Sequence, residues 1–426
     1  MSKPSLRGNI VSMIFWQLGN YVIPLLTFPY LTRVLGVAHF GIYALAFATT
    51  SYFCLLVDWG FLLGAPGKIA RVGDDLAQLN DIFWSTFFAK LLLMLATLPV
   101  IGIAILVSPG VRAMAPVLLC SYGMVLANII TVNWCLQGLE RLDRLATASM
   151  IGRGLTVPAT FLLVHGSGDT WIAALIQSGG AMITGIASIV LLRKLNVIRR
   201  PSTTPSTLWH AAWTQIRETW PLFLSALSSN LYTSTNTVML GMLRGPVDTG
   251  LFSSADRLRS AAQATIAPIS HAVYPRASRL MADDPDSAMA LARRLLLLQG
   301  AFTFCIAAVL MVGAPTIIHM LAGPKFEQSV PVLRLLAPIP FLVGLANVFG
   351  IQLMLPLGMH RMFSRITTAA ALLDLLIVVP LSWYFGAPGT AAAALVTEGF
   401  VVVTMGVVLI RADVPLFQAP RAGLRA

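Results

Sequence analysis

Nine ionisable side chains lie inside long apolar stretches of this 426-residue chain, where each needs a partner or a task. A charge held in hydrocarbon is costly, so such residues usually pair or mark the path of a ligand or ion. The guanidinium of arginine matches phosphate and carboxylate groups, and a buried carboxylate can take up a proton or a sodium ion. The basic members are Lys90, Arg153, Arg257, Arg259 and Arg334, and the acidic members are Asp58, Asp256, Asp374 and Glu398.

Among the cations, Arg257 is the strongest candidate for holding an anionic ligand. Asp256 and Arg259 lie three residues apart, so they can pair on one helix face. Arg257 points elsewhere and has no acidic partner within its own stretch. Arg259 is the second candidate, because Asp256 can neutralise it. Arg153 lies about one turn inside its stretch, and it can either bind a ligand or extend to the membrane surface. Lys90 and Arg334 are expected to extend in that way.

Among the acids, Asp58, Asp374 and Glu398 are the candidates for coupling to a proton or sodium ion. The alternative is that all three pair with arginine or lysine on other helices, and the sequence leaves both open.

A run of polar residues from 228 to 237 supplies the candidate uncharged groups, Asn230, Tyr232 and Asn236. Lipid cannot satisfy an asparagine side chain, so this segment should face protein or water. Its counterpart near the N-terminus carries Asn20 on a polar face. Both segments are predicted to line a cavity, although hydroxyl and amide residues also hold membrane helices together.

The elements that position these residues are membrane-spanning helices. The chain is 57% hydrophobic and 11% charged, and about 20 apolar residues cross a bilayer as a helix. Windows of that size number about twelve, so we predict an all-α polytopic membrane protein of about twelve transmembrane helices. The windows are 9–32, 41–65, 82–107, 113–137, 147–165, 170–192, 219–241, 251–275, 291–321, 329–356, 364–385 and 389–410.

The net charge of +12 is mainly a topology signal. With a cytoplasmic N-terminus, 20 of the 29 lysines and arginines fall in cytoplasmic segments, 4 fall on the opposite side and 5 fall within spans. This bias predicts that both termini are cytoplasmic. Because the charge is explained in this way, nucleic acid is not expected as a partner.

The chain also divides into two similar halves. A polar, proline-containing segment, 193–217, separates an N-terminal six-helix bundle, 1–192, from a C-terminal one, 218–411, and 412–426 is a cytoplasmic tail. Asn128, Gly138, Arg141 and Pro158 recur about 220 positions later as Asn347, Gly358, Arg361 and Pro380. We therefore predict pseudo-symmetric bundles around a central cavity, an arrangement typical of secondary transporters.

Several classes of function are disfavoured. The sequence has no GxxxxGK[ST] loop for nucleotide, no cluster of metal ligands and no grouping of catalytic residues. We therefore expect no cofactor or metal and no enzymatic activity.

The first half carries the motif Phe28-Pro29-Tyr30-Leu31-Thr32-Arg33-Val34-Leu35-Gly36, with Asn9, Trp16, Phe40-Gly41-Ile42-Tyr43 and Asp58-Trp59-Gly60-Phe61. The second half adds Trp220-Pro221, Asn236-Thr237, Leu240-Gly241, Gly250-Leu251-Phe252, Tyr274-Pro275-Arg276 and Val330-Pro331-Val332-Leu333-Arg334. In these motifs the chain resembles the O-antigen-type polysaccharide-transport flippases of the multidrug/oligosaccharidyl-lipid/polysaccharide exporter superfamily.

This resemblance implies outward movement of an undecaprenyl-diphosphate-linked oligosaccharide across the bacterial inner membrane by alternating access, coupled to an ion gradient. The expected partners are that lipid-linked saccharide and membrane lipid, with a polysaccharide polymerase and a chain-length regulator as candidates. The main alternative is a multidrug exporter of the same superfamily, which would favour an acidic cavity. A scaffold of a polysaccharide assembly complex and an integral membrane enzyme are weaker alternatives.

Overall fold

The computed structural model describes residues 6–73, 75–139, 141–194, 197–198 and 204–414. Within these ranges, the side chains of 6–22, 142–146, 148, 205, 225, 228–234, 267–272 and 275 lie outside the description. The described residues form helices joined by short turns and loops and contain no strand, as the sequence predicts for the fold class. The chain falls into two compact units, Met1–Ser234 (unit 1) and Thr235–Ala426 (unit 2).

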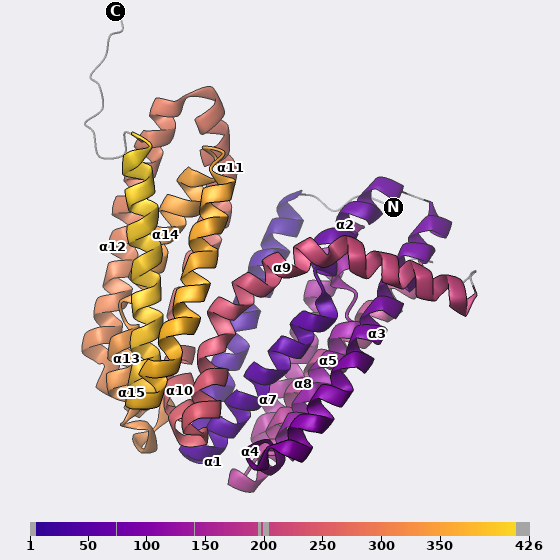
Figure 1. Ribbon diagram of the computed structural model, residues 1–426, viewed down its shortest axis with the longest axis horizontal. Coiled ribbons are helices and arrows are strands. Elements are labelled where there is room, and N and C mark those ends of the chain that lie inside the picture. The colour runs from indigo at the N-terminus through magenta and orange to yellow at the C-terminus, as the bar shows by residue number, and fades with distance from the viewer. Residues whose placement is uncertain (1–5, 74, 140, 195–196, 199–203, 415–426) are drawn as a thin grey trace, which may run out of the picture. The chain divides into compact units, whose positions relative to one another are not determined.

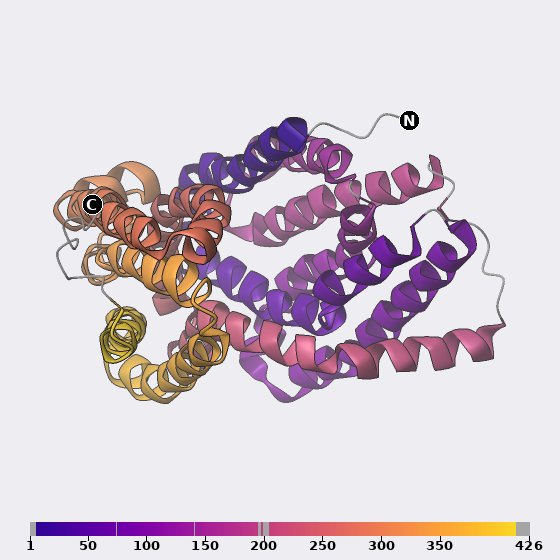
Figure 2. The same cartoon turned by 90° about the horizontal axis from the view of Figure 1, so that it is seen from above.

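Unit 1 is built mainly from helices that pack side by side, with α5 and α7 both against α8, and α1 against α5 and α7 (Figures 1 and 2). Its α-helices are α1 (Leu6–Asp58), α2 (Phe61–Val72), α3 (Leu76–Val107), α4 (Pro109–Ala113), α5 (Ala115–Ile130), α6 (Asn133–Gly138), α7 (Leu142–Leu163) and α8 (Thr170–Lys194), and a 3₁₀ turn, η1, covers Ser167–Asp169.

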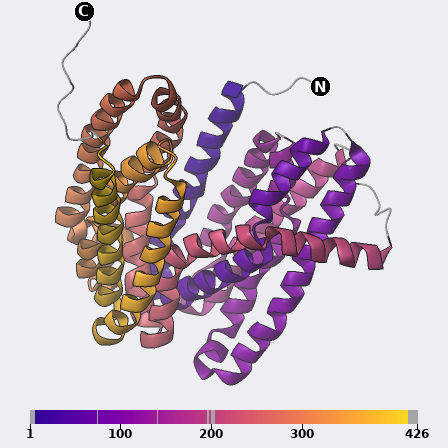
Figure 3. The same cartoon turned by 45° about the horizontal axis from the view of Figure 1, so that its top comes forward.

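The 40-residue helix α9 (Pro205–Arg244) begins in unit 1 and continues into unit 2. Its first part crosses the helices of unit 1 (Figures 1 and 3), where the Trp59 indole stacks on Phe223 and donates to the Ile216 carbonyl at 2.9 Å. Gly60 has φ +77°, and a Cβ there would lie 2.8 Å from the Leu222 Cβ. Only glycine permits this turn and this approach, so the local sequence fixes α9 against unit 1.

Unit 2 is a second bundle, in which α13 and α14 both pack against α15 and α12 packs against α14 (Figures 1 and 3). Its further α-helices are α10 (Pro246–Gln263), α11 (Ile266–Asp283), α12 (Pro285–Ile317), α13 (Ser329–Leu336), α14 (Ile339–Asn347) and α15 (His360–Arg411). Two π-helical turns, η2 (Ile318–Ala322) and η4 (Val348–Met354), and a 3₁₀ turn, η3 (Pro324–Phe326), join them.

Seven helical stretches in the described chain are long and apolar enough to cross a bilayer. Two of them, Ile23–Val72 and His360–Arg411, contain 50 and 52 residues. At 1.5 Å per residue, each is about 75 Å long, more than twice the roughly 30 Å hydrocarbon core. Each is broken by a glycine with positive φ, Gly36 (φ 72°) and Gly386 (φ 61°), where the helix can reverse. Each therefore has the length of two spans, and the count of about twelve stays a prediction.

The distribution of apolar side chains is that of a protein in lipid. Large aliphatic residues lie on the outer surface, among them Val107, Leu297 and Val312, which are 75%, 74% and 80% exposed. A water-soluble protein seldom leaves so many large apolar side chains uncovered. The chain is a multi-pass membrane protein.

Candidate functional site

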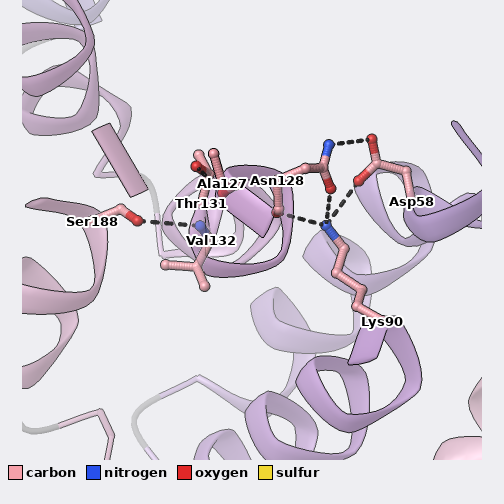
Figure 4. A network of polar contacts seen from close by, with 7 residues as sticks. All are labelled: Asp58, Lys90, Ala127, Asn128, Thr131, Val132 and Ser188. Atoms are coloured by element: carbon pink, nitrogen blue, oxygen red, sulfur yellow. Dashed lines mark hydrogen bonds and ion pairs between the residues drawn. The ribbon is translucent and has the colours of Figure 1, made fainter. Parts of the chain in front are cut away.

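A closed polar network joins three helices of unit 1 at Asp58, Lys90 and Asn128 (Figure 4). Lys90 Nζ lies 2.8 Å from Asp58 Oδ1 and donates to Asn128 Oδ1 at 3.1 Å and to the Asn128 carbonyl at 3.3 Å. Asn128 Nδ2 closes the ring by donating to Asp58 Oδ2 at 3.0 Å. An ammonium group has three donors, and here all three have acceptors.

The burial of this network differs between its two charges. The Lys90 side chain is 2% exposed, whereas the Asp58 side chain is 31% exposed. Lys90 therefore depends on Asp58 for neutralisation, while Asp58 retains partial access to a cavity that it lines. The expectation that Lys90 extends to the membrane surface is wrong, because its ammonium turns inward to this pair.

The cavity has a volume of about 450 Å³ and lies within unit 1. Helices α1, α3, α5, α6, α7 and α8 supply its principal polar lining, namely Asp58, Lys90, Asn128, Trp134, Arg153 and Gln177. The structure thus brings together two residues that the sequence singled out separately, Asp58 and Arg153.

Arg153 is the uncompensated charge among the described residues that line this cavity. It is half-buried in α7, and its guanidinium takes part in no hydrogen bond or ion pair with any described residue. Trp134 is 1% exposed, and its indole Nε1 also has no partner in the described part of the chain. The cavity therefore offers a cation that no described group neutralises, and the unpartnered indole N–H of Trp134 is buried in its wall.

Unit 2 holds a second polar centre around Asp374 of α15, which is 1% exposed. The Thr397 hydroxyl donates to Asp374 Oδ1 at 3.1 Å, and Asn236 of α9 also faces this carboxyl group. Asp374 Oδ2 and Asn236 Oδ1 are both buried without a hydrogen-bond partner among the described residues. Two oxygen acceptors thus remain unsatisfied here, a costly arrangement unless a proton or cation joins them.

Helix α10 carries the two arginines predicted to hold an anion. Arg259 pairs with Asp256, at 2.7 Å between Nη2 and Oδ1, which confirms the pairing expected from their spacing. Arg259 also donates to Gln263 Oε1 and to the Ser260 hydroxyl. Arg257 is half-buried and has an interaction partner of its own, so it is less isolated than its sequence suggests.

For the remaining predicted residues, the structure describes fewer contacts. Glu398 is half-buried in α15 and also has an interaction partner. The side chains of Asn20, Asn230 and Tyr232 lie outside the described residues. No group of three or more His, Cys, Asp or Glu that could hold a metal occurs in the described part of the chain.

No pattern in the sequence predicts that Asn128, Trp134 or Thr397 belongs to a functional site. Asn128 had appeared only as a marker of the internal repeat, and nothing in its neighbourhood predicts a contact with Lys90, 38 positions away. The contact between Thr397 and Asp374 could have been predicted from the sequence. Asp374 lies 12 residues before Gly386, and Thr397 lies 11 residues after it. If the chain reverses at that glycine, the two residues come level on adjacent helix segments.

Comparison with known proteins finds one family model and two named proteins that are similar to this chain. Residues 6–281 match the model of a family described as "Polysaccharide biosynthesis protein". A protein of Escherichia coli (strain K12) named "Putative O-antigen transporter" is 33% identical over 401 residues, covering 93% of this chain and 95% of that protein. A Shigella dysenteriae protein of the same name is 28% identical over 403 residues, covering 94% and 99%.

Solved structures support the fold. The lipid II flippase MurJ in an inward closed conformation matches with a TM-score of 0.73 at 13% identity, covering 96% of this chain and 88% of that one. An inward-facing multidrug resistance MATE family transporter of the MOP superfamily matches with a TM-score of 0.70 at 14% identity, covering 96% and 100%. At these identities, the likeness shows a shared helical fold.

Proposed function

Because the chain belongs to the polysaccharide biosynthesis protein family, we propose that it is a lipid flippase rather than an enzyme. It moves undecaprenyl-diphosphate-linked oligosaccharide repeat units from the cytoplasmic to the periplasmic leaflet, by alternating access, for assembly of a surface polysaccharide. The observation that carries this proposal is the near full-length match to two proteins named as O-antigen transporters.

The chemistry of such a substrate fits the polar groups inside the bundles. A diphosphate and a hydroxyl-rich saccharide cannot cross hydrocarbon unaided, so the path needs donors and positive charge at membrane depth. Arg153 in unit 1 and Arg257 and Arg259 in unit 2 are the cations we assign to this path. Asn20, Asn230, Tyr232 and Asn236 are proposed to contact the saccharide, while the lipid tail stays in the bilayer.

Asp374 is proposed as the residue that couples transport to an ion gradient. A carboxyl group that is 1% exposed and has an unsatisfied oxygen next to Asn236 is poorly stabilised as a bare anion. Uptake of a proton or a sodium ion removes that penalty, and release of the ion restores it. Asp58 is the weaker coupling candidate, because Lys90 already neutralises it. Glu398 is the third candidate.

We place the protein in the bacterial inner membrane with both termini cytoplasmic. Reporter fusions after Arg200 and Arg365 should read as cytoplasmic, and fusions near Arg112 and Lys325 should read as periplasmic. A periplasmic reading at Arg200 would overturn this orientation. The polymerase and the chain-length regulator of the same polysaccharide are proposed as partners at the periplasmic face.

The function can be tested by deleting the coding gene in its host. We expect loss of the surface polysaccharide and accumulation of the lipid-linked repeat unit in the cytoplasmic leaflet, both reversed by the wild-type gene on a plasmid. Unchanged surface polysaccharide in the deletion strain would count against a role as flippase.

Export of cationic drugs is the second candidate, because the fold is shared with a multidrug transporter. The uncompensated charge in the unit 1 cavity is positive, which disfavours a cationic drug there. The same deletion strain should therefore keep its resistance to cationic dyes and drugs, and a marked increase in sensitivity would favour this second candidate.

A further inference from the structure

We infer that the cavity inside unit 1 is an oxyanion-binding subsite, in which Arg153 holds a phosphate or carboxylate group of the transported molecule. The origin of that group rests on the proposed function, whereas the subsite itself is defined by residues of unit 1 alone. It thus lies within one helical bundle and does not depend on the arrangement of the two units.

The charged side chains that line the cavity leave a net positive charge in it. Asp58 and Lys90 form an ion pair at 2.8 Å, and Asn128 accepts from Lys90 and donates to Asp58, so the network carries no net charge. Arg153 adds a positive charge that no described residue neutralises. A cation in such a confined site interacts with an anion more strongly than it would in bulk water.

The hydrogen-bonding groups of the lining residues favour an oxyanion as the bound group. A guanidinium presents several N–H groups in a fixed fork that fits two oxygens of a phosphate or carboxylate. Trp134 lines the same cavity, is 1% exposed and has an indole N–H without a partner in the described chain. This N–H and Asn133 Oδ1, an unpartnered acceptor of another lining residue, are both buried in the wall, so Arg153 is the donor that an oxyanion in the cavity would meet.

The volume sets the size of the group that can be accommodated. A cavity of about 450 Å³ falls in the range of small-molecule pockets, roughly 300–1,000 Å³. It has room for a diphosphate or an acidic sugar residue, and it is too small for a whole repeat unit with its lipid. The subsite would therefore hold one anionic group of a larger molecule, from either the diphosphate or an acidic sugar.

The test uses the full-length protein in lipid nanodiscs with a single reporter cysteine at the cavity wall. Ser51 lines the cavity and is half-buried, so Ser51→Cys is placed in a background in which Cys54, Cys120, Cys135 and Cys305 are replaced by serine or alanine. The rate of modification by a small neutral thiol reagent is measured against increasing inorganic pyrophosphate, and separately against increasing glucuronate.

We expect at least one of the two anions to slow modification. Arg153→Gln should raise the half-protecting concentration roughly 10-fold to 100-fold, the usual effect of losing a charge-assisted hydrogen bond. Arg153→Lys should fall in between, and it keeps the test valid if the glutamine variant folds poorly. Arg112→Gln is the matched control, because Arg112 is exposed and donates to the carbonyls of Ile105 and Leu106 instead. This control should leave protection unchanged.

The two anions separate the sources of the bound group. Protection by pyrophosphate alone assigns the subsite to the diphosphate, and protection by glucuronate alone assigns it to an acidic sugar. Protection by neither anion, or equal protection in the wild-type protein and both Arg153 variants, overturns the subsite. Lipid movement is measured with the same purified variants in sealed proteoliposomes, so Arg153-dependent protection without transport refutes the proposed function and leaves the subsite standing. Transport without protection refutes the subsite and leaves the proposed function standing.

Discussion

Removing the Asp58 carboxylate should destabilise unit 1 more than removing the Lys90 ammonium, although the two form one ion pair. Lys90 is 2% exposed, so Asp58→Ala leaves its charge buried and without a counterion. Asp58 is 31% exposed, so after Lys90→Met its carboxylate can still be hydrated from the cavity. The asymmetry in burial therefore predicts an asymmetry in stability.

The magnitude follows from the separation of the charges. Two unit charges 2.8 Å apart attract by about 6 kcal/mol at an effective dielectric constant of roughly 20. Part of that is offset by the cost of burying Lys90, and breaking a buried pair from one side typically costs about 3–5 kcal/mol. We expect about 3 kcal/mol for Asp58→Ala, and less for Lys90→Met. The double variant should be more stable than the sum predicts, by about 2 kcal/mol.

The assay is reversible unfolding of the purified protein in mixed micelles, followed for the wild type, both single variants and the double variant. The matched control is the pair Lys68–Glu218, whose side chains are 32% and 53% exposed. Lys68→Met should cost less than about 1 kcal/mol, since exposed pairs contribute little. Equal losses for Asp58→Ala and Lys90→Met, or strictly additive effects in the double variant, would refute the closed network. If the double variant still transports in response to an ion gradient, Asp58 has no role in coupling.

Three further variants test other parts of the structure. Asp374→Asn should preserve expression and folding, because a neutral amide suits this buried position, yet it should remove the dependence of transport on the ion gradient; a retained dependence would exclude Asp374. Arg257→Ala should abolish polysaccharide export and Arg257→Lys should retain part of it at equal protein levels, whereas normal export by the alanine variant would remove Arg257 from the path. Gly386→Ala should destabilise the protein by about 1–3 kcal/mol, because φ is +61° and the new Cβ would lie 2.8 Å from Asp248 Oδ2. Gly102→Ala is its control, since Gly102 lies in α3 and a Cβ added there would have nothing within 4 Å; a similar loss of stability in this variant would contradict the explanation.

The features of the fold that the sequence predicts are those that depend on local pattern. Runs of apolar residues predict the helices, because a membrane helix satisfies its own backbone and needs only a lipid-compatible surface. The pair Asp256–Arg259 was predictable for the same reason, since three residues on a helix bring two side chains to one face.

The contacts of the candidate site depend on how separate helices pack, and the sequence does not encode this in any local pattern. Lys90 finds its partners 32 and 38 positions away, on α1 and α5, and its burial reverses the expectation that it extends to the surface. The Asp374–Thr397 contact was within reach of sequence reasoning only through the reversal at Gly386. The position of Arg153 in a shared cavity with Asp58 required the structure, because five helices beyond their own contribute to the same wall.

Reconstituted lipid movement is the most direct test of the proposed function. The lipid-linked repeat unit would be isolated from the deletion strain, labelled on its saccharide with a fluorophore and placed in proteoliposomes that contain the purified protein. An impermeant quencher then reports how much substrate has reached the outer leaflet. We predict that the wild-type protein speeds this movement over protein-free vesicles and that an imposed ion gradient speeds it further. Movement no faster than in protein-free vesicles, with protein that is folded and correctly inserted, would contradict the assignment as a flippase.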